Sequence, residues 1–158
     1  MSKKPTGNIT IENARLILKD FSGERNRFSN DRTFGVVLEP EIAEELRNDG
    51  WPVKTFAPRD EEYDEPLEWI KVKVVFGKVP PKIVLISGNR KKILEEDSVS
   101  ILDWVSIEKA DLIIRPYNYD FGGKTGTKAY LNSLYVTKRE DTLEDKYADI
   151  PEEMPFEN

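Results

Sequence analysis

Apolar and polar residues alternate over many short stretches of the chain, which is the pattern of β-strands with one buried face. The alternation is strictest at 69–76, where every even-numbered residue is apolar. Other strands are predicted at 9–21, 33–38, 83–87, 111–119 and 128–137. The last two flank the sequence FGGKTGT, and we therefore expect them to form a long β-hairpin.

One helix is predicted, over 39–50. Pro40 stands at the position of a first helical residue, the glutamates that follow suit the positive end of a helix, and Gly50 is a typical C-terminal stop. Residues 58–66 form an acidic loop, and 93–110 fit either a strand or a short helix. We expect a mainly β fold, a small barrel of five to six strands with one short inserted helix.

The net charge of -6 is divided unevenly along the chain. Residues 140–158 contain eight acidic side chains and one lysine, whereas the other 139 residues carry 23 basic and 22 acidic ones. A segment so rich in charge and poor in apolar residues does not fold alone. We therefore expect a domain at 1–139 and a disordered, flexible acidic tail at 140–158. The nearly neutral domain remains able to bind a polyanion.

The chain contains neither cysteine nor histidine, which restricts its chemistry. Disulfides, thiolate metal sites and Ser-His-Asp catalysis are excluded, and we expect a protein that is not an enzyme and uses no metal or other cofactor. No apolar run approaches the roughly 20 residues of a membrane helix, and the N-terminus has no secretory signal. We expect a cytoplasmic protein that makes no contact with a membrane.

Two predicted strands combine aromatic rings and cations on one face. These faces carry Trp69, Lys71 and Lys73 in the first strand, and Arg115, Tyr117, Tyr119 and Phe121 in the second. Single-stranded nucleic acid is bound by this combination, because bases stack on rings and phosphates contact lysines. The alternative is an ordinary solvated strand face, or tyrosines packed in the core with their hydroxyl groups bonded outward. Pro116 favours a strand that lies at an edge of the sheet or ends there.

Basic clusters in turns supply further candidate phosphate contacts. One surrounds Phe28, a second follows Ser87, and lysines lie in and after the predicted hairpin turn. The predicted residues that bind single-stranded DNA are Arg25, Arg27, Phe28, Arg32, Trp51, Lys54, Trp69, Lys71, Lys73, Arg90, Lys91, Arg115, Tyr117, Tyr119, Lys124 and Lys128.

The C-terminal sequence ADIPEEMPF places a few apolar residues among carboxylates, as in short peptides displayed for a partner protein. It resembles the acidic tip that ends bacterial and phage single-stranded DNA-binding proteins. The body resembles the phage type of these proteins in Phe21-Ser-Gly, Arg32-Thr-Phe34, Asp49-Gly50-Trp51, Trp69-Ile-Lys-Val, Pro80-Pro81 and Lys128-Ala-Tyr-Leu. The predicted partner-binding residues of the tail are Asp149, Ile150, Pro151, Met154, Pro155 and Phe156.

The resemblance implies a barrel of the oligonucleotide/oligosaccharide-binding (OB) type. It also implies a protein that coats and protects exposed single strands, without sequence preference, in phage DNA replication, recombination and repair. In that family the tip recruits replication and recombination proteins and usually ends on Pro-Phe, whereas Glu157 and Asn158 follow here. A phage-encoded protein of this kind would work in the cytoplasm of its bacterial host.

We hypothesise that the body binds about 4–16 nucleotides and that the tail, with its charge of -7, competes with DNA for the same groove. A homodimer is compatible with the sequence. One alternative is a non-catalytic viral protein-interaction module, whose exposed aromatic residues contact protein. A second is a Mg²⁺-dependent nuclease that uses the acidic run at 60–65.

Overall fold

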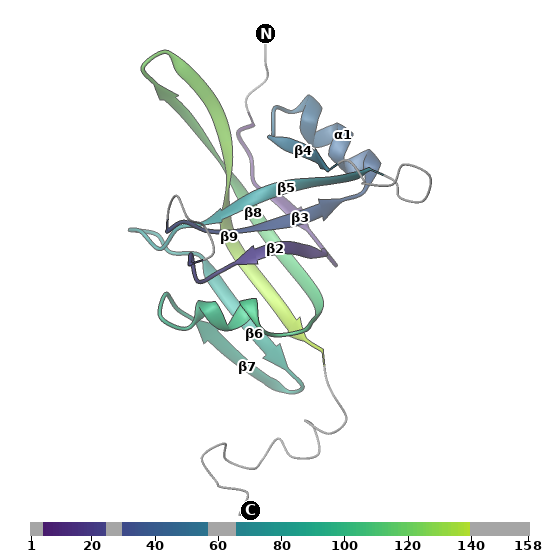
Figure 1. Ribbon diagram of the computed structural model, residues 1–158, viewed down its shortest axis with the longest axis vertical. Coiled ribbons are helices and arrows are strands. Elements are labelled where there is room, and N and C mark those ends of the chain that lie inside the picture. The colour runs from purple at the N-terminus through teal and green to yellow at the C-terminus, as the bar shows by residue number, and fades with distance from the viewer. Residues whose placement is uncertain (1–4, 25–29, 57–65, 140–158) are drawn as a thin grey trace, which may run out of the picture.

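The computed structural model describes residues 5–24, 30–56 and 66–139 as a mainly β protein (Figure 1). The described part contains nine strands and one α-helix, and a short 3₁₀ helix precedes the long hairpin. In chain order the elements are β1 (Ile9–Ile11), β2 (Leu16–Asp20), β3 (Arg32–Leu38), α1 (Pro40–Asn48), β4 (Val53–Phe56), β5 (Leu67–Val74), β6 (Lys82–Ser87), β7 (Arg90–Leu94), the 3₁₀ helix η1 (Val99–Asp103), β8 (Ile107–Phe121) and β9 (Lys124–Lys138).

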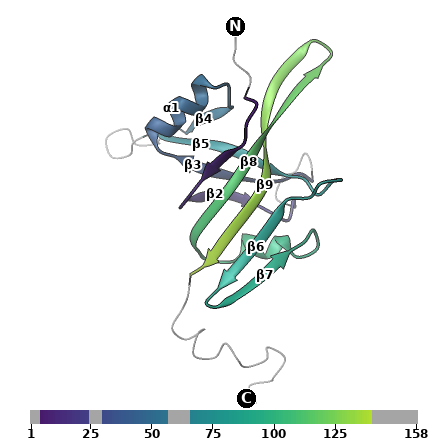
Figure 2. The ribbon, with the colours of Figure 1, turned by 180° about the vertical axis from the view of Figure 1, so that it is seen from behind.

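All nine strands belong to one sheet, whose main path runs β1-β8-β9-β5-β3-β2. Strand β4 pairs with β5, and β6 pairs with both β7 and β9. Most neighbours are antiparallel, but β9 runs parallel to β5 and to β6. The dark purple strand β1 lies beside β8 in Figure 2, although more than 90 residues separate the two in the chain.

The two ends of this path, β1 and β2, are consecutive segments of the chain. Between them, the Ala14 N–H donates a hydrogen bond to the Ala110 carbonyl of β8 at 2.7 Å. The next carbonyl, that of Arg15, accepts one from the Val37 N–H of β3 at 3.0 Å. The short link therefore joins opposite ends of the sheet, so the sheet is rolled like a barrel wall and not laid flat.

The prediction of one continuous strand over 9–21 is wrong. Asn13 and Leu18 have positive φ angles of 53° and 50°, and the β2–β3 register shifts between Ile17 and Asp20. A non-glycine residue in this region is uncommon and breaks the regular alternation of a strand. The break lets the segment change partner from β8 to β3, which a straight strand could not do.

The other predicted elements are confirmed. The strands near 33–38, 69–76 and 83–87, the hairpin and the helix are all present, and 93–110 contains the end of β7, the helix η1 and the start of β8. The strand number is nine and not five to six, because the segment 9–21 divides into β1 and β2, and because β4 and β7 carry too few residues to show a clear alternation.

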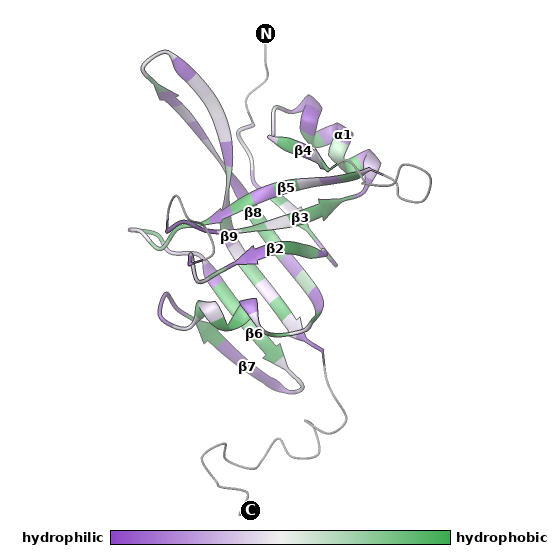
Figure 3. Ribbon diagram, viewed as in Figure 1, coloured by the Kyte–Doolittle hydropathy of each residue, from purple (hydrophilic) through white to green (hydrophobic). Residues whose placement is uncertain are grey.

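The core follows the predicted alternation. Ile70, Val72 and Val74 of β5 are buried, and so are Phe34 and Val36 of β3. In Figure 3 green and purple segments alternate along the strands, as expected when every second side chain faces the core. Helix α1 covers one end of the sheet with the buried side chains of Ala43 and Leu46. Within the described ranges no helix is long and apolar enough to cross a membrane.

Candidate nucleic-acid interface

The outer face of β5 continues directly onto β9. The two strands run parallel, with Val72 beside Ala129 and Lys73 beside Tyr130. Val72 and Ala129 are both buried, so Lys73 and Tyr130 both point away from the core. Trp69, Lys71 and Lys73 of β5 therefore share one surface with the outward-facing residues of the hairpin.

One face of the β8–β9 hairpin carries an aromatic–cation ladder. Residues directly opposite each other in an antiparallel pair lie on the same face. The pairs that form the ladder are Arg115 with Tyr130, Tyr117 with Lys128, Tyr119 with Gly126, and Phe121 with Lys124. Every rung thus contains one aromatic ring, and three of the four rungs contain a cation.

The rings of the ladder touch one another and the cations. The Tyr117 and Tyr130 rings stack with centroids 4.8 Å apart and planes within 1°. The Arg115 guanidinium lies 5.1 Å from the centre of the Tyr130 ring, and the Lys128 ammonium lies 5.6 Å from that of Tyr119. Tyr117 is 45% exposed. A planar surface edged by positive charge is therefore open to solvent.

Gly126 allows the Tyr119 ring to lie across β9. A side chain at this position would collide with the Tyr119 hydroxyl group and ring. An aromatic residue that covers a glycine on the neighbouring strand is a known means of stabilising such a site in a sheet. The ladder therefore depends on a glycine at the only rung that has no cation.

Trp69 lies flat against β3 in the same way. A Cβ on Gly35 would be 2.8 Å from Cε3 of Trp69 and 2.9 Å from Cγ1 of Ile17. The Lys54 ammonium of β4 lies 5.4 Å from the Trp69 ring centre. The Trp69 Nε1 atom is buried and makes no hydrogen bond. Leu18, which is 60% exposed, lines the same hollow as Gly35, Lys54 and Trp69.

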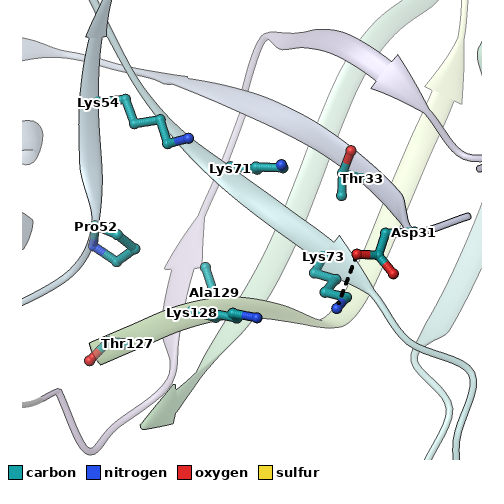
Figure 4. Close-up of a pocket in the computed structure, with 9 residues that line it drawn as sticks. All are labelled: Asp31, Thr33, Pro52, Lys54, Lys71, Lys73, Thr127, Lys128 and Ala129. Carbon is teal, nitrogen blue, oxygen red and sulfur yellow. Dashed lines mark ion pairs between the residues drawn. The ribbon is translucent and has the colours of Figure 1, made fainter. Parts of the chain in front are cut away.

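Four lysines surround a cleft between β5 and β9, which we call the lysine cleft (Figure 4). They are Lys54, Lys71, Lys73 and Lys128, and they come from β4, β5 and β9. Asp31 lines the same cleft and forms an ion pair with Lys73 at 3.3 Å. One carboxylate beside four ammonium groups leaves the cleft strongly positive, which favours binding of an anion such as a phosphate.

The structure brings most of the predicted DNA-binding residues together. The residues that lie in the lysine cleft, in the ladder or against Trp69 are Lys54, Trp69, Lys71, Lys73, Arg115, Tyr117, Tyr119, Lys124 and Lys128.

Trp51 and Arg32 have structural positions, so their assignment to the surface is corrected. Trp51 is only 3% exposed and lies in the core, where its ring cannot meet a base. Its backbone N–H donates to the carbonyl of Leu46 in the last turn of α1, and the chain turns there so that the ring points inward. The Arg32 guanidinium donates from Nη1 to the Phe21 carbonyl at 2.7 Å and lies over the Phe76 ring. It also pairs with Glu96 at 3.9 Å, so it is engaged within the fold.

Arg90 and Lys91 lie apart from this surface. They begin β7, next to the β6–β7 turn. Strand β6 runs parallel to the last part of β9, where Ile86 pairs with Thr137. The ladder occupies the opposite end of β9, so these two cations are not adjacent to it.

The remaining predictions fall outside the described residues. They concern Arg25, Arg27, Phe28, the acidic run at 60–65, and the tail residues Asp149, Ile150, Pro151, Met154, Pro155 and Phe156. Within the part of the chain that the structure describes, no three acidic residues are arranged to hold a metal ion.

Sequence reasoning missed Tyr130, Gly35, Gly126 and Leu18. Tyr130 stands two residues after Lys128, so the alternation of the strand itself places the two on one face. The glycines had no recognisable signal, because their role depends on which ring lies across them. Leu18 is exposed only because β2 breaks its alternation there.

Comparison with known proteins adds independent findings. A family model described as "Putative phage ssDNA-binding domain" matches residues 1–155. The fold is similar to that of the single-stranded DNA-binding protein from bacteriophage Enc34, with a TM-score of 0.54 and 13% identity over 85% of this chain and 83% of that chain. The structure of that protein in complex with ssDNA matches with a TM-score of 0.54 and 12% identity over 85% of this chain and 88% of that chain. No curated protein sequence matches the chain.

Replacing Gly35 tests the position of Trp69. Gly35→Ala should lower the free energy of unfolding by about 1–3 kcal/mol, because the new methyl group meets the indole and Ile17 in a packed site. Urea unfolding followed by circular dichroism measures this loss. The tryptophan emission maximum, read in a Trp104→Phe background that keeps only Trp69 and the buried Trp51, should also shift as the Trp69 ring is displaced.

Gly77→Ala is the matched control, since its Cβ would meet only Val75 Cγ1, at an ordinary 3.8 Å. It should unfold like the parent chain. Equal stability and emission for Gly35→Ala and Gly77→Ala would show that Trp69 does not rest on Gly35.

Proposed function

We propose that this chain, which belongs to the family of phage single-stranded DNA-binding domains and binds single-stranded DNA in phage replication, holds the strand across the lysine cleft and the aromatic–cation ladder. The observation that carries this proposal is the continuity of the two. Lys73 and Tyr130 are neighbours in the sheet, and Lys128 belongs to both the cleft and the ladder. A bound DNA strand can therefore run from the lysine cleft to the ladder and remain in contact with lysines and aromatic rings throughout.

The chemistry of this surface suits a flexible strand of any sequence. Rings offer a face to any base, and ammonium groups meet phosphates, so neither contact reads the edge of a base. Successive rungs of the ladder lie two residues apart, which is roughly 7 Å along a strand. This spacing is about the thickness of two stacked rings, so a base can stack upon each successive rung when the backbone is extended.

The tail belongs to the proposal through its charge. Residues 1–139 would form the DNA-binding domain, while residues 140–158, with a charge of -7, would compete with DNA for the positive cleft. DNA that displaces the tail would free it for replication and recombination proteins. We place this activity in the cytoplasm of an infected bacterium, and a homodimer is compatible with it.

Removing rings from the ladder should weaken DNA binding. Tyr117→Ala and Tyr130→Ala should each raise the Kd for oligo-dT by about 5- to 150-fold, because one stacked base contributes about 1–3 kcal/mol. Trp69 fluorescence, which bound bases should quench, or the anisotropy of a labelled strand measures the Kd.

Tyr135→Ala is the control for these two variants. Tyr135 is also a half-exposed tyrosine of β9 beneath a lysine, with Lys82 at 5.9 Å, but it lies beyond the part of β9 that forms the ladder. Its loss should leave the Kd unchanged. If the parent chain neither binds nor is quenched by oligo-dT, a protein-interaction module becomes the better reading.

Removing cleft charges should change the salt dependence of binding. Lys71→Gln and Lys128→Gln should each make the slope of log K against log salt less negative by about 0.7, because each lost phosphate contact to a single strand removes the counterion release that goes with it. Anisotropy titrations over a series of salt concentrations give the slope. Lys109→Gln, an exposed lysine that pairs with Asp111 near the other end of β8, should leave it unchanged. Equal slopes for all three variants would place the phosphates elsewhere.

Deleting residues 140–158 should tighten DNA binding, most clearly at low salt, because it removes a competing segment of charge -7. The control keeps the length of the tail but replaces its acidic residues by Asn and Gln, and it should bind as tightly as the deletion. A deletion variant with the parent affinity, or a lower one, would contradict tail competition.

A further inference from the structure

The far end of the β8–β9 hairpin projects from the sheet as a two-stranded ribbon. Strand β1 pairs with β8 only as far as Ile114, and β5 pairs with β9 only at Ala129 and Tyr130. From Pro116 to Lys128 the two strands pair with each other alone among the described strands. In Figure 1 and Figure 2 this green end stands clear of the other strands.

The ribbon is held at its base on the face opposite the ladder. Asn118 donates a hydrogen bond from its side-chain nitrogen to the Pro5 carbonyl at 2.8 Å and accepts one from the Thr127 hydroxyl group at 2.7 Å. These contacts tie the N-terminal segment to one face only. The described residues therefore leave the ladder face of the ribbon open to a ligand.

The last rung of the ladder differs from the others in its exposure. Phe121 is 81% exposed, whereas Tyr117 is 45% exposed and stacks on Tyr130. Lys124 stands opposite Phe121, and the turn between them is Gly122-Gly123, which carries no side chains. Asp120 lies on the other face of the ribbon, opposite Thr125. The tip thus presents an exposed aromatic ring, one cation and a turn without side chains.

We propose that this tip binds the junction between single-stranded and double-stranded DNA, with the Phe121 ring stacked on the terminal base pair. The inference rests on the proposed function, because the unpaired strand would follow the ladder outward and reach Phe121 last. Beyond the last unpaired base the next flat surface of such a DNA is the base pair at the end of the duplex. Apolar side chains that stack on or between base pairs are a recurrent means of binding and opening duplexes.

The remaining features of the tip fit a duplex end. Two glycines allow both strands to approach the turn closely, and Lys124 is positioned for a phosphate beside the last base pair. A two-stranded β-ribbon is also narrow enough to enter a DNA groove. Continuity with the ladder favours DNA as the occupant over a second protein, because the same face already carries the surface proposed for the strand.

Three labelled DNAs test the proposal with the full chain. They are an oligo-dT of about 12 nucleotides, a hairpin duplex that carries the same strand as a single-stranded extension (the tailed duplex), and the hairpin duplex without the extension. The parent chain should bind the tailed duplex about 5- to 100-fold more tightly than the strand alone, the effect of one added ring stack. Phe121→Ala should abolish this preference, because it weakens binding to the tailed duplex by more than it weakens binding to oligo-dT, whereas Phe121→Trp should retain it.

Trp104→Ala is the matched control, since Trp104 is 80% exposed and precedes the start of β8. The start of β8 lies roughly 45 Å from Phe121 along an extended strand. Trp104→Ala should keep the preference for the tailed duplex. A parent chain that binds oligo-dT but shows no such preference would overturn this inference and leave the proposed function intact.

Two further results would also overturn it. If Phe121→Ala weakens binding to oligo-dT and to the tailed duplex equally, Phe121 is one more rung for the single strand. If Phe121→Ala weakens binding only to single strands long enough to hold several copies of the protein, the tip contacts a neighbouring copy and not the duplex end. A parent chain that fails to bind oligo-dT at all would instead contradict the proposed function.

Discussion

The proposed DNA-binding surface depends on the register in which β5 and β9 pair. Only Val72 with Ala129 and Lys73 with Tyr130 join these strands, yet this short parallel pairing decides which side chains share the outer face. A slip of one residue would turn every side chain of a strand to the opposite face. The lysines of β5 would then be separated from the rings of the hairpin, and polar groups would enter the core beside Ile70 and Val74.

The same surface concentrates groups that do little for the stability of the isolated chain. Four ammonium groups share a cleft with one carboxylate, and the ring of Tyr117 is left half in solvent. Mutual repulsion and exposed aromatic area both favour a state in which an anion with flat, apolar bases covers them. Gly35 and Gly126 leave room for the rings of Trp69 and Tyr119, which a side chain at either position would meet.

The sequence allowed the hairpin, the helix and the face of β5 to be predicted, because the direction of a side chain in a strand follows from its parity alone. Lys71, Lys73, Tyr117 and Tyr119 were placed on outward-facing positions in this way. Contacts that depend on distant segments could not be predicted. Trp51 is buried because the chain turns inward after α1, and Arg32 donates hydrogen bonds to the carbonyls of residues 21–22. The basic β6–β7 turn lies at the end of β9 away from the ladder. The break at Asn13 and Leu18 has no signature that alternation could show.

The pairing of β1 with β8 also affects the order in which the sheet forms during synthesis of the chain. Within the described sheet β1 pairs only with β8, so Ile9 meets Ile114 across more than a hundred residues. Loops of this length are closed slowly, and such contacts lower the rate of folding. On a ribosome the first strand must wait until two thirds of the polypeptide have emerged. The rolled sheet is therefore completed late, and the nascent N-terminal segment is the part most in need of protection until then.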